Sequence, residues 1–149
     1  MSSETTPIGS STATTPTEAR ARARLTELVS SMRGLRGALL ASLDGRPIAA
    51  VLHHHPIGST AAIIASSRGL GERLAELSGE GRLEEIVVRS TAGYVVIYAA
   101  GDRGVLTVLT ESAANLAMLH LRARDVAAEL GKLIDAPIVA GPRPANGSR

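Results

Sequence analysis

Only two aromatic residues, Tyr94 and Tyr98, occur in this chain of 149 residues, which has no Phe or Trp. Its apolar content still reaches 44%, because Ala, Leu, Val and Ile are abundant. With so few aromatic rings, the chain is poorly suited to stacking on bases or planar cofactors and to lining a large apolar pocket. The sequence therefore predicts a core of small aliphatic side chains, in which helices lie close to a sheet and leave little room for a ligand cavity.

The sequence contains no cysteine, which excludes disulfides, thiolate zinc sites, thiol nucleophiles and iron–sulfur ligation. The formal net charge of +2 is too small to favour a polyanionic partner. Arg20, Arg22 and Arg24 alternate near the N-terminus, but no aromatic residues are interleaved with them for base stacking. We expect a solvated basic helix end there and no nucleic-acid binding.

Two tails flank the predicted domain. Twelve of the first seventeen residues are Ser, Thr or Pro, a composition that cannot bury enough apolar surface to offset the entropy of ordering. The chain from residue 136 onward is rich in Pro and Gly. We expect disordered tails at residues 1–17 and 136–149 around one domain at residues 18–135. No signal peptide or membrane span is recognisable, so we expect a cytoplasmic protein without membrane insertion.

The spacing of apolar residues predicts a helix and then a hairpin at the start of the domain. Thr17 is the expected N-cap of a first helix that stops at Gly34. Short apolar runs at residues 37–43 and 47–52 flank Asp44–Gly45, a dipeptide that suits a type I′ turn between two strands.

A second helix, capped by Ser59 or Thr60, is predicted to run to about Leu77. One apolar stripe lies along it at helical spacing, so we predict that this stripe packs into the core. The stripe consists of Ile63, Ser67, Leu70, Leu74 and Leu77.

Three more strands are predicted at about residues 83–90, 94–100 and 105–110, followed by a third helix capped by Ser112. Because the last strand is apolar on both faces, we expect helices to cover both faces of the sheet. The resulting order is α-β-β-α-β-β-β-α. The apolar stripe of the third helix is Leu116, Leu119, Ala123, Val126, Leu130 and Leu133.

This order resembles the roadblock/dynein light-chain family over nearly all of residues 20–135, and the small residues of the second helix fit the family as well. The other segments that carry the resemblance are residues 32–40, Asp44–Gly45, Gly93–Tyr94 and Gly101–Asp102. The chain is most similar to short bacterial members that are encoded beside small Ras-like GTPases.

The resemblance implies an α+β, profilin-like sandwich, in which a five-stranded antiparallel sheet has one helix on one face and two on the other. It also implies a homodimer whose third strands pair edge to edge and whose second helices pack together. Members of the family regulate or scaffold small GTPases. Some accelerate GTP hydrolysis without inserting a catalytic arginine, and they bind no nucleotide themselves.

A second face of the predicted second helix carries Ala62, Ser66, Gly69 and Arg73. Gly69 and Gly71 each cost the helix about 1 kcal/mol relative to Ala, so a close backbone approach is expected there. A partner helix would explain this cost, which makes the face a candidate dimer interface. Close packing onto the chain's own sheet is the alternative.

The predicted third strand contributes Glu85, Val87 and Arg89 to the candidate dimer interface. If this strand is an edge, its unpaired backbone groups invite antiparallel pairing with a second copy of the chain. Glu85 and Arg89 then meet across the two-fold axis. Alternatively, the two charged residues are solvated and discourage aggregation.

Arg68, Glu72 and Glu76 lie opposite the predicted core stripe of the second helix, where we expect them to be exposed, and are candidates for a GTPase-facing surface. An arginine there would supply positive charge to the developing phosphate charge during GTP hydrolysis. Nothing in the sequence marks one arginine as inserted, so repositioning of the GTPase's own residues is the favoured mechanism.

His53, His54 and His55 form the most conspicuous motif of the sequence. In an extended segment only His53 and His55 share a face, so at most two ligands converge. The remaining histidine, His120, belongs to the predicted third helix. We expect a solvated loop and no metal site, with metal binding and a pH-sensitive contact as the alternatives.

No catalytic or phosphate-binding motif is present: the patterns G-x-x-x-x-G-K-S/T and G-x-S-x-G are both missing. Glu84 and Glu85 point to opposite faces of a strand, which is wrong for shared acid–base work. We predict that the protein is not an enzyme, holds no cofactor and acts on a GTPase active site that belongs to its partner. A small ligand- or metal-sensing domain and a light-chain-like structural adaptor are the alternatives.

Overall fold

The computed structural model describes residues 14–136. Within them the helices and strands are α1 (Pro16–Ser30), β1 (Leu35–Ser42), β2 (Pro47–Val51), α2 (Ile57–Glu76), β3 (Glu85–Arg89), β4 (Gly93–Ala100), β5 (Gly104–Glu111) and α3 (Leu116–Asp135). This sequence of elements confirms the predicted order α-β-β-α-β-β-β-α. The predicted tails lie outside the described residues, except for residues 14–17 and Ala136.

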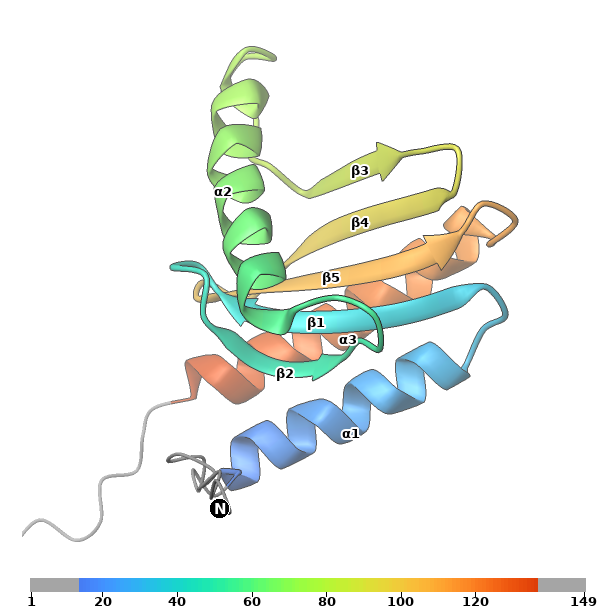
Figure 1. The fold of residues 1–149 in the computed structure, drawn as a ribbon. Helices are drawn as coiled ribbons and strands as arrows, with labels where there is room; N and C mark the ends of the chain where they lie inside the picture. The colour runs from blue at the N-terminus through green and yellow to red at the C-terminus, as the bar shows by residue number, and fades with distance from the viewer. Residues whose placement is uncertain (1–13, 137–149) are drawn as a thin grey trace, which may run out of the picture.

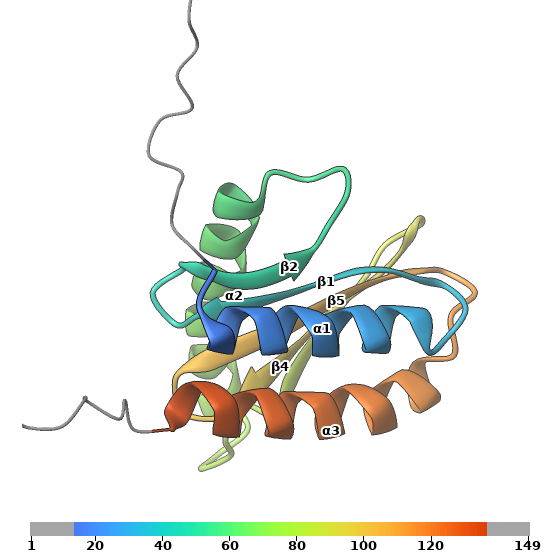
Figure 2. The ribbon, with the colours of Figure 1, turned by 90° about the horizontal axis from the view of Figure 1, so that it is seen from below.

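The five strands form one antiparallel sheet in the order β2-β1-β5-β4-β3. Helices α1 and α3 lie side by side on one face, and α2 crosses the other face (Figures 1 and 2). One helix on one face and two on the other confirm the expected α+β sandwich. No helix in the described range is long and apolar enough to cross a membrane.

The main core lies between the sheet and the α1–α3 layer, and it is aliphatic as the composition predicts. Tyr98 is its one fully buried aromatic side chain among the described residues, with an exposed fraction of 2%. The largest core side chains are Leu25, Leu28, Leu40, Leu106, Leu119 and Leu130. The predicted stripe of α3 is therefore confirmed as a core face, because its central residues are buried here.

Arg24 joins α1 to α3 instead of being solvated. Its Nε donates a hydrogen bond to Glu129 Oε2 at 2.7 Å, and its Nη2 donates to Oε1 at 3.1 Å. These hydrogen bonds hold the pKa of the Glu129 carboxyl below its usual range. Both side chains remain partly exposed, so the pair adds only about 0–1 kcal/mol to the free energy of unfolding. Arg20 and Arg22 are exposed, as expected.

The structure corrects two of the predicted N-caps. Helix α1 is capped by Thr15 rather than Thr17, because Pro16 fits the first helical position and its missing N–H is not needed there. Helix α3 is capped by Asn115 rather than Ser112. In both helices the capping side chain accepts a hydrogen bond of 3.0 Å from the backbone N–H three residues later.

The predicted caps of α2 are also wrong. The helix begins at Ile57 after Pro56, which offers no side-chain cap. Ser59 and Thr60 lie inside the first turn, where their hydroxyls donate to the carbonyl of Pro56 at 3.4 and 2.6 Å. The proline ends the preceding extended segment, so the helix starts earlier than the polar residues indicated.

The turn at Asp44–Gly45 joins β1 and β2 as predicted, but it is not a type I′ turn. Gly45 has a φ of +87°, whereas no non-glycine residue in the described range has a positive φ. The N–H of Gly45 donates to the carbonyl of Ser42, and the N–H of Ser42 donates to the carbonyl of Arg46. The loop is therefore a three-residue connection in which a type I turn is followed by a left-handed glycine.

Candidate interaction surface

The apolar stripe of α2 faces solvent, which contradicts the prediction that it packs into the core. Ile63, Leu70 and Leu74 have exposed fractions of 63%, 61% and 58%. Leu77, which follows the last helical turn, reaches 82%. The helix instead packs on the sheet through a narrower set of buried residues, Ala61, Ile64 and Gly71. Periodicity correctly identified one apolar face, but small residues on a different face allow the close approach to the sheet.

Gly71 and Gly69 have different surroundings. A Cβ atom at Gly71 would lie 2.7 Å from Ile86 Cδ1 and 3.3 Å from Leu83 Cδ2, so packing within the chain explains this glycine. A Cβ atom at Gly69 would meet no described residue within 4 Å. The fold of the single chain therefore does not require Gly69. The other members of the candidate dimer face on α2 are exposed as well: Ala62, Ser66 and Arg73.

Strand β3 lies at one edge of the sheet, as predicted, and pairs with β4 through all five of its residues. Val87 and Val88 have exposed fractions of 41% and 50%, and Arg89 is also exposed. The opposite side of β3 has no neighbouring strand among the described residues. Its backbone groups are thus available for pairing with another chain.

Glu85 is held by α3 of its own chain. Its Oε2 accepts a hydrogen bond from Arg124 Nη2 at 3.0 Å and lies 3.6 Å from Nδ1 of His120. That His120 nitrogen also lies 2.8 Å from the Tyr98 hydroxyl. Burial, together with the Glu85 charge, raises the pKa of Tyr98 above its usual range. Glu85 is therefore half-buried by an intramolecular cluster that sequence reasoning did not find, because its members are far apart in the chain.

Arg68, Glu72 and Glu76 share one surface, but Arg68 turns toward the sheet. The side chain of Arg68 has an exposed fraction of 16%, and its Nη2 donates to Glu72 Oε1 at 3.1 Å. All three residues line a hollow between α2 and the β4–β5 turn. The expectation that Arg68 is exposed was wrong, because the face opposite the apolar stripe is the side that meets the sheet.

The C-terminal part of α2 reaches past the β3 edge (Figure 1). Gly71 packs on Ile86 of β3, and Leu74 and Leu77 follow beyond this contact. The residues from Glu72 to Leu77 extend about 9 Å at the helical rise of about 1.5 Å per residue. This overhang leaves Leu74 and Leu77 without cover from their own sheet.

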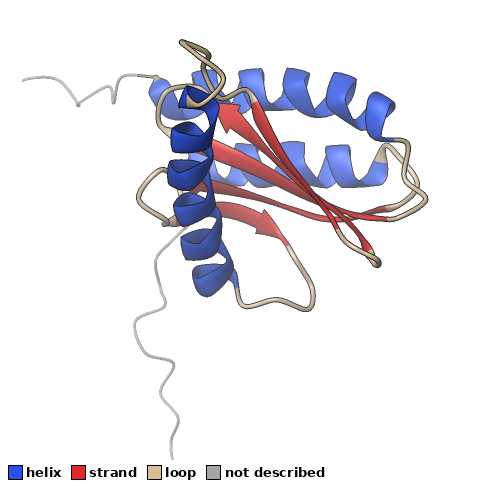
Figure 3. Ribbon diagram, turned by 90° about the horizontal axis from the view of Figure 1, so that it is seen from above, coloured by secondary structure: helices blue, strands red, loops and turns tan. Residues whose placement is uncertain are grey.

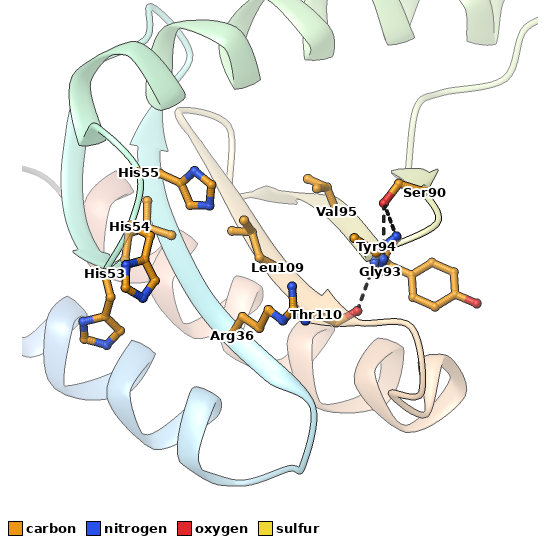
Figure 4. A pocket seen from close by; sticks show the side chains of 12 residues that line it. Arg36, His53, His54, His55, Ser90, Gly93, Tyr94, Val95, Leu109 and Thr110 are labelled. Carbon is orange, nitrogen blue, oxygen red and sulfur yellow. Dashed lines mark hydrogen bonds between the residues drawn. The ribbon is translucent and has the colours of Figure 1, made fainter.

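On the face that α2 crosses, the strand ends far from the helix are not covered (Figure 3). The strand register aligns Val88, Val95 and Leu109 across β3, β4 and β5, and all three are exposed or half-buried. A hollow of about 420 Å³ lies at this end, and the exposed residues His53–His55 form part of its wall (Figure 4). No group of three metal-ligating side chains is found in the described part of the chain.

A known protein family matches the chain over more than half of its length. The sequence model of the Roadblock/LC7 domain matches residues 22–110. The chain belongs to the Roadblock/LC7 family. This result confirms the resemblance that rests on the order of elements and on the turns at Asp44–Gly45 and Gly101–Asp102.

Relatives of this Roadblock/LC7 chain include the uncharacterized protein MJ1340 of Methanocaldococcus jannaschii, which is 29% identical over 98 residues, or 65% of this chain and 85% of the relative. The gliding protein MglB of Thermus thermophilus has a TM-score of 0.72 and 22% identity, covering 80% of this chain and 91% of that chain. A structure of MglB with a tetrameric arrangement has a TM-score of 0.73 and 24% identity, covering 80% and 90%. At these identities the two solved structures establish the fold.

Proposed function

We propose that this Roadblock/LC7 chain is a cytoplasmic, non-enzymatic homodimer that regulates or scaffolds a small Ras-like GTPase in signalling. Family membership supports the GTPase as the partner, because the members that the chain resembles act on such proteins. The observation that carries the proposal is the solvent-facing apolar stripe of α2. Large apolar side chains that gather on one exposed face are typical of an interaction surface.

The dimer proposed here has a two-fold axis that passes through Val87 of β3, perpendicular to the sheet. Symmetric antiparallel pairing about Val87 sets Ile86 of each chain opposite Val88 of the other. The two sheets then join into one sheet of ten strands and no β3 edge remains open. Such a contact is isologous, as two-fold symmetry requires.

This axis also brings the two α2 helices together. Because α2 crosses the Ile86 end of its own β3, the axis carries the partner's helix to the Val88 end. The overhanging residues Leu74 and Leu77 of each chain then lie over Val88 and Val95 of the other chain, so exposed apolar groups cover one another. A two-fold axis reverses the direction of the second helix, and the two helices therefore pack antiparallel. Gly69 lies on the exposed side, where a second helix can come close.

Glu85 gains an additional partner in this arrangement. Residue 85 of one chain lies opposite residue 89 of the other, so Arg89 of the partner approaches a carboxylate that Arg124 already holds. The contacts of Glu85 within its own chain are thus compatible with the pairing of Glu85 and Arg89. The proposed interface comprises Ala62, Ser66, Gly69, Arg73, Glu85, Val87 and Arg89, with the apolar stripe added.

Arg68, Glu72 and Glu76 form the proposed GTPase-facing surface. Their charged groups line one hollow on the α2 side of the sheet, which suits polar contacts with a folded partner. Arg68 is already paired with Glu72 and is not extended into solvent. We therefore propose that it positions residues of the GTPase and does not enter the GTP site as an arginine finger.

The test is GTP turnover by the Ras-like GTPase that is encoded nearest to this chain, with and without the protein. We expect altered turnover and tighter capture of one nucleotide state in pull-downs with the GTP- and GDP-bound forms. Arg68→Ala should lower any acceleration by less than about tenfold, whereas loss of an arginine finger costs about 10³-fold or more. No binding to either nucleotide form would rule the proposal out. Binding without nucleotide dependence would favour the structural adaptor instead.

A further inference from the structure

We propose that the hollow between the His53–His55 loop and the β3–β4 turn binds a short protein segment that carries acidic side chains beside apolar ones. We call this hollow the basic groove. It is separate from the surface formed by Arg68, Glu72 and Glu76, and from the apolar stripe of α2. Its residues come from β1, β4, β5 and the two loops that border the open end of the sheet (Figure 4).

The floor of the basic groove is apolar. Val95 and Leu109 lie next to one another on β4 and β5, and both are half-buried. Leu52 follows β2 and contributes a further half-buried aliphatic side chain. The volume of about 420 Å³ lies within the range of about 300–1,000 Å³ that binding pockets occupy. Aliphatic side chains of a ligand would therefore find both room and apolar contacts.

The wall of the basic groove carries basic side chains and, among its described residues, no carboxylate. Arg36 and the three histidines at 53–55 line it, and no Asp or Glu is among the described residues of its wall. Arg36 is exposed, and its guanidinium has no hydrogen-bond or ion-pair partner within residues 14–136. By contrast, the hollow beside Arg68 and Glu72 contains side chains of both signs. Charge complementarity therefore favours an acidic occupant, which Arg36 can bind through a bidentate contact.

The Ser90 and Thr110 hydroxyl groups of the basic groove are already used inside the chain. Ser90 Oγ accepts from the backbone N–H groups of Ala92 and Gly93 and donates to the carbonyl of Gly93. Thr110 Oγ1 accepts from the N–H of Tyr94 and donates to the carbonyl of Glu111. The charged rim must therefore supply most of the polar recognition. A segment with carboxylates fits this rim better than a ligand that needs neutral hydroxyl contacts.

In the proposed dimer the partner's α2 overhang covers Val95, while the part of the basic groove formed by Leu109, Leu52 and Arg36 stays accessible. The overhang of α2 extends about 9 Å, which is about two strand spacings of about 4.8 Å. Counted from its own β3, the overhang of one chain passes the partner's β3 and reaches the partner's β4. It therefore ends before Leu109 of β5 and Arg36 of β1. In Figure 4 the lining residues extend from the His53–His55 loop past Arg36 and Leu109 to the β3–β4 turn, an arrangement that an extended chain covers more fully than a small molecule. The occupant that fits best is therefore a chain segment that lies across β5 and β1.

The test uses full-length, isotope-labelled protein and three synthetic hexapeptides, in which Asp alternates with Leu, Lys with Leu, or Asp with Ser. We expect the Asp–Leu peptide to shift the backbone amide signals of Leu109 and Leu52, which line the uncovered part of the groove, and to bind more tightly than the other two. Arg36→Glu should weaken this binding by about fivefold or more, because it reverses the charge of the rim. Arg20→Glu, an exposed arginine on the opposite face, should leave it unchanged.

Three results would overturn the proposal: no shifts at Leu109 and Leu52, binding of the Lys–Leu or Asp–Ser peptide as tight as that of the Asp–Leu peptide, or equal losses in the two arginine variants. Arg36→Glu is expected to keep the dimer mass and the effect on GTP turnover. Failure of the peptide test therefore leaves the proposed GTPase role in place, and failure of the GTPase test leaves the basic groove in place.

Discussion

Leu74→Asp is expected to convert the proposed dimer into a folded monomer. The side chain of Leu74 is already 58% exposed in the single chain, so an aspartate there costs the folded monomer little. In the proposed dimer, burial of one leucine contributes about 1.5–3 kcal/mol to the free energy of association. Because the interface is symmetric, Leu74 of each chain makes this contribution. The substitution also places two carboxylates in an apolar contact without partners. Together these effects raise the dimer dissociation constant by about 10³-fold or more.

Sedimentation equilibrium at micromolar concentration measures this change. The unmodified protein should have twice the chain mass of 15.4 kDa, and Leu74→Asp should have the mass of one chain. Leu121→Asp is the matched control, because Leu121 is 64% exposed on α3, which covers the other face of the sheet. The α2 stripe would lose its proposed role if both variants stayed dimeric or if the unmodified protein were monomeric.

Gly93→Ala is expected to destabilise the fold by about 3–5 kcal/mol, which is large against a typical domain stability of about 5–15 kcal/mol. Gly93 begins β4 with a φ of +155°, and it pairs with Glu111 of β5. A Cβ atom at this position would overlap the carbonyl oxygen of Thr110 and lie 2.9 Å from its carbonyl carbon. Both contacts are with backbone atoms, so β4 and β5 would have to move apart to accommodate the Cβ atom.

Urea unfolding followed by circular dichroism tests this expectation, with Leu74→Asp as the common background so that dimerisation does not contribute. Gly69→Ala is the control, because a Cβ atom there meets no described residue within 4 Å. A helical glycine replaced by alanine in open space should gain about 0.5–1 kcal/mol. Equal stabilities for the two variants would contradict the close approach of Gly93 to Thr110.

Local patterns predicted most of the fold, because the spacing of apolar residues within each segment indicates whether that segment is a helix or a strand. The two apolar runs around Asp44–Gly45 became β1 and β2, and the stripe of α3 became a core face. The helix starts were less accurate, since several Ser and Thr residues precede each helix and only one can cap it. At Thr15 the decisive neighbour is Pro16, which sets the first helical position.

The orientation of α2 could not be predicted from its own sequence. Leu70 and Leu74 are as apolar as a core stripe, and nothing within the helix indicates that Gly71 and Ala61 meet the sheet instead. Helix α2 carries two candidate packing faces, a small-residue face that is buried on the sheet and the apolar stripe, which we propose is buried between subunits. The spacing of apolar residues identifies the more apolar face of a helix, and in α2 that face is exposed to solvent.

Contacts between distant segments account for the rest of what sequence reasoning missed. The cluster of Glu85, His120 and Arg124 depends on the position of α3 beneath the sheet, from which its side chains reach Glu85 of β3. The basic groove depends on the strand register, which brings Val95 beside Leu109 and places both near the histidine loop. Neither arrangement can be recognised from residue spacing in the sequence, because its members belong to separate helices, strands and loops.

The most direct test of the proposed dimer is disulfide formation by Val87→Cys. The chain has no cysteine, so a single introduced thiol can cross-link only to its copy in another chain. Directly opposite residues of an antiparallel pair have Cβ atoms about 4.5–5.5 Å apart, close to what a disulfide needs. We predict that mild oxidation rapidly yields a covalent dimer from Val87→Cys, and only slowly from the exposed α3 control Leu121→Cys. Equal rates for the two variants would contradict pairing of β3 about Val87.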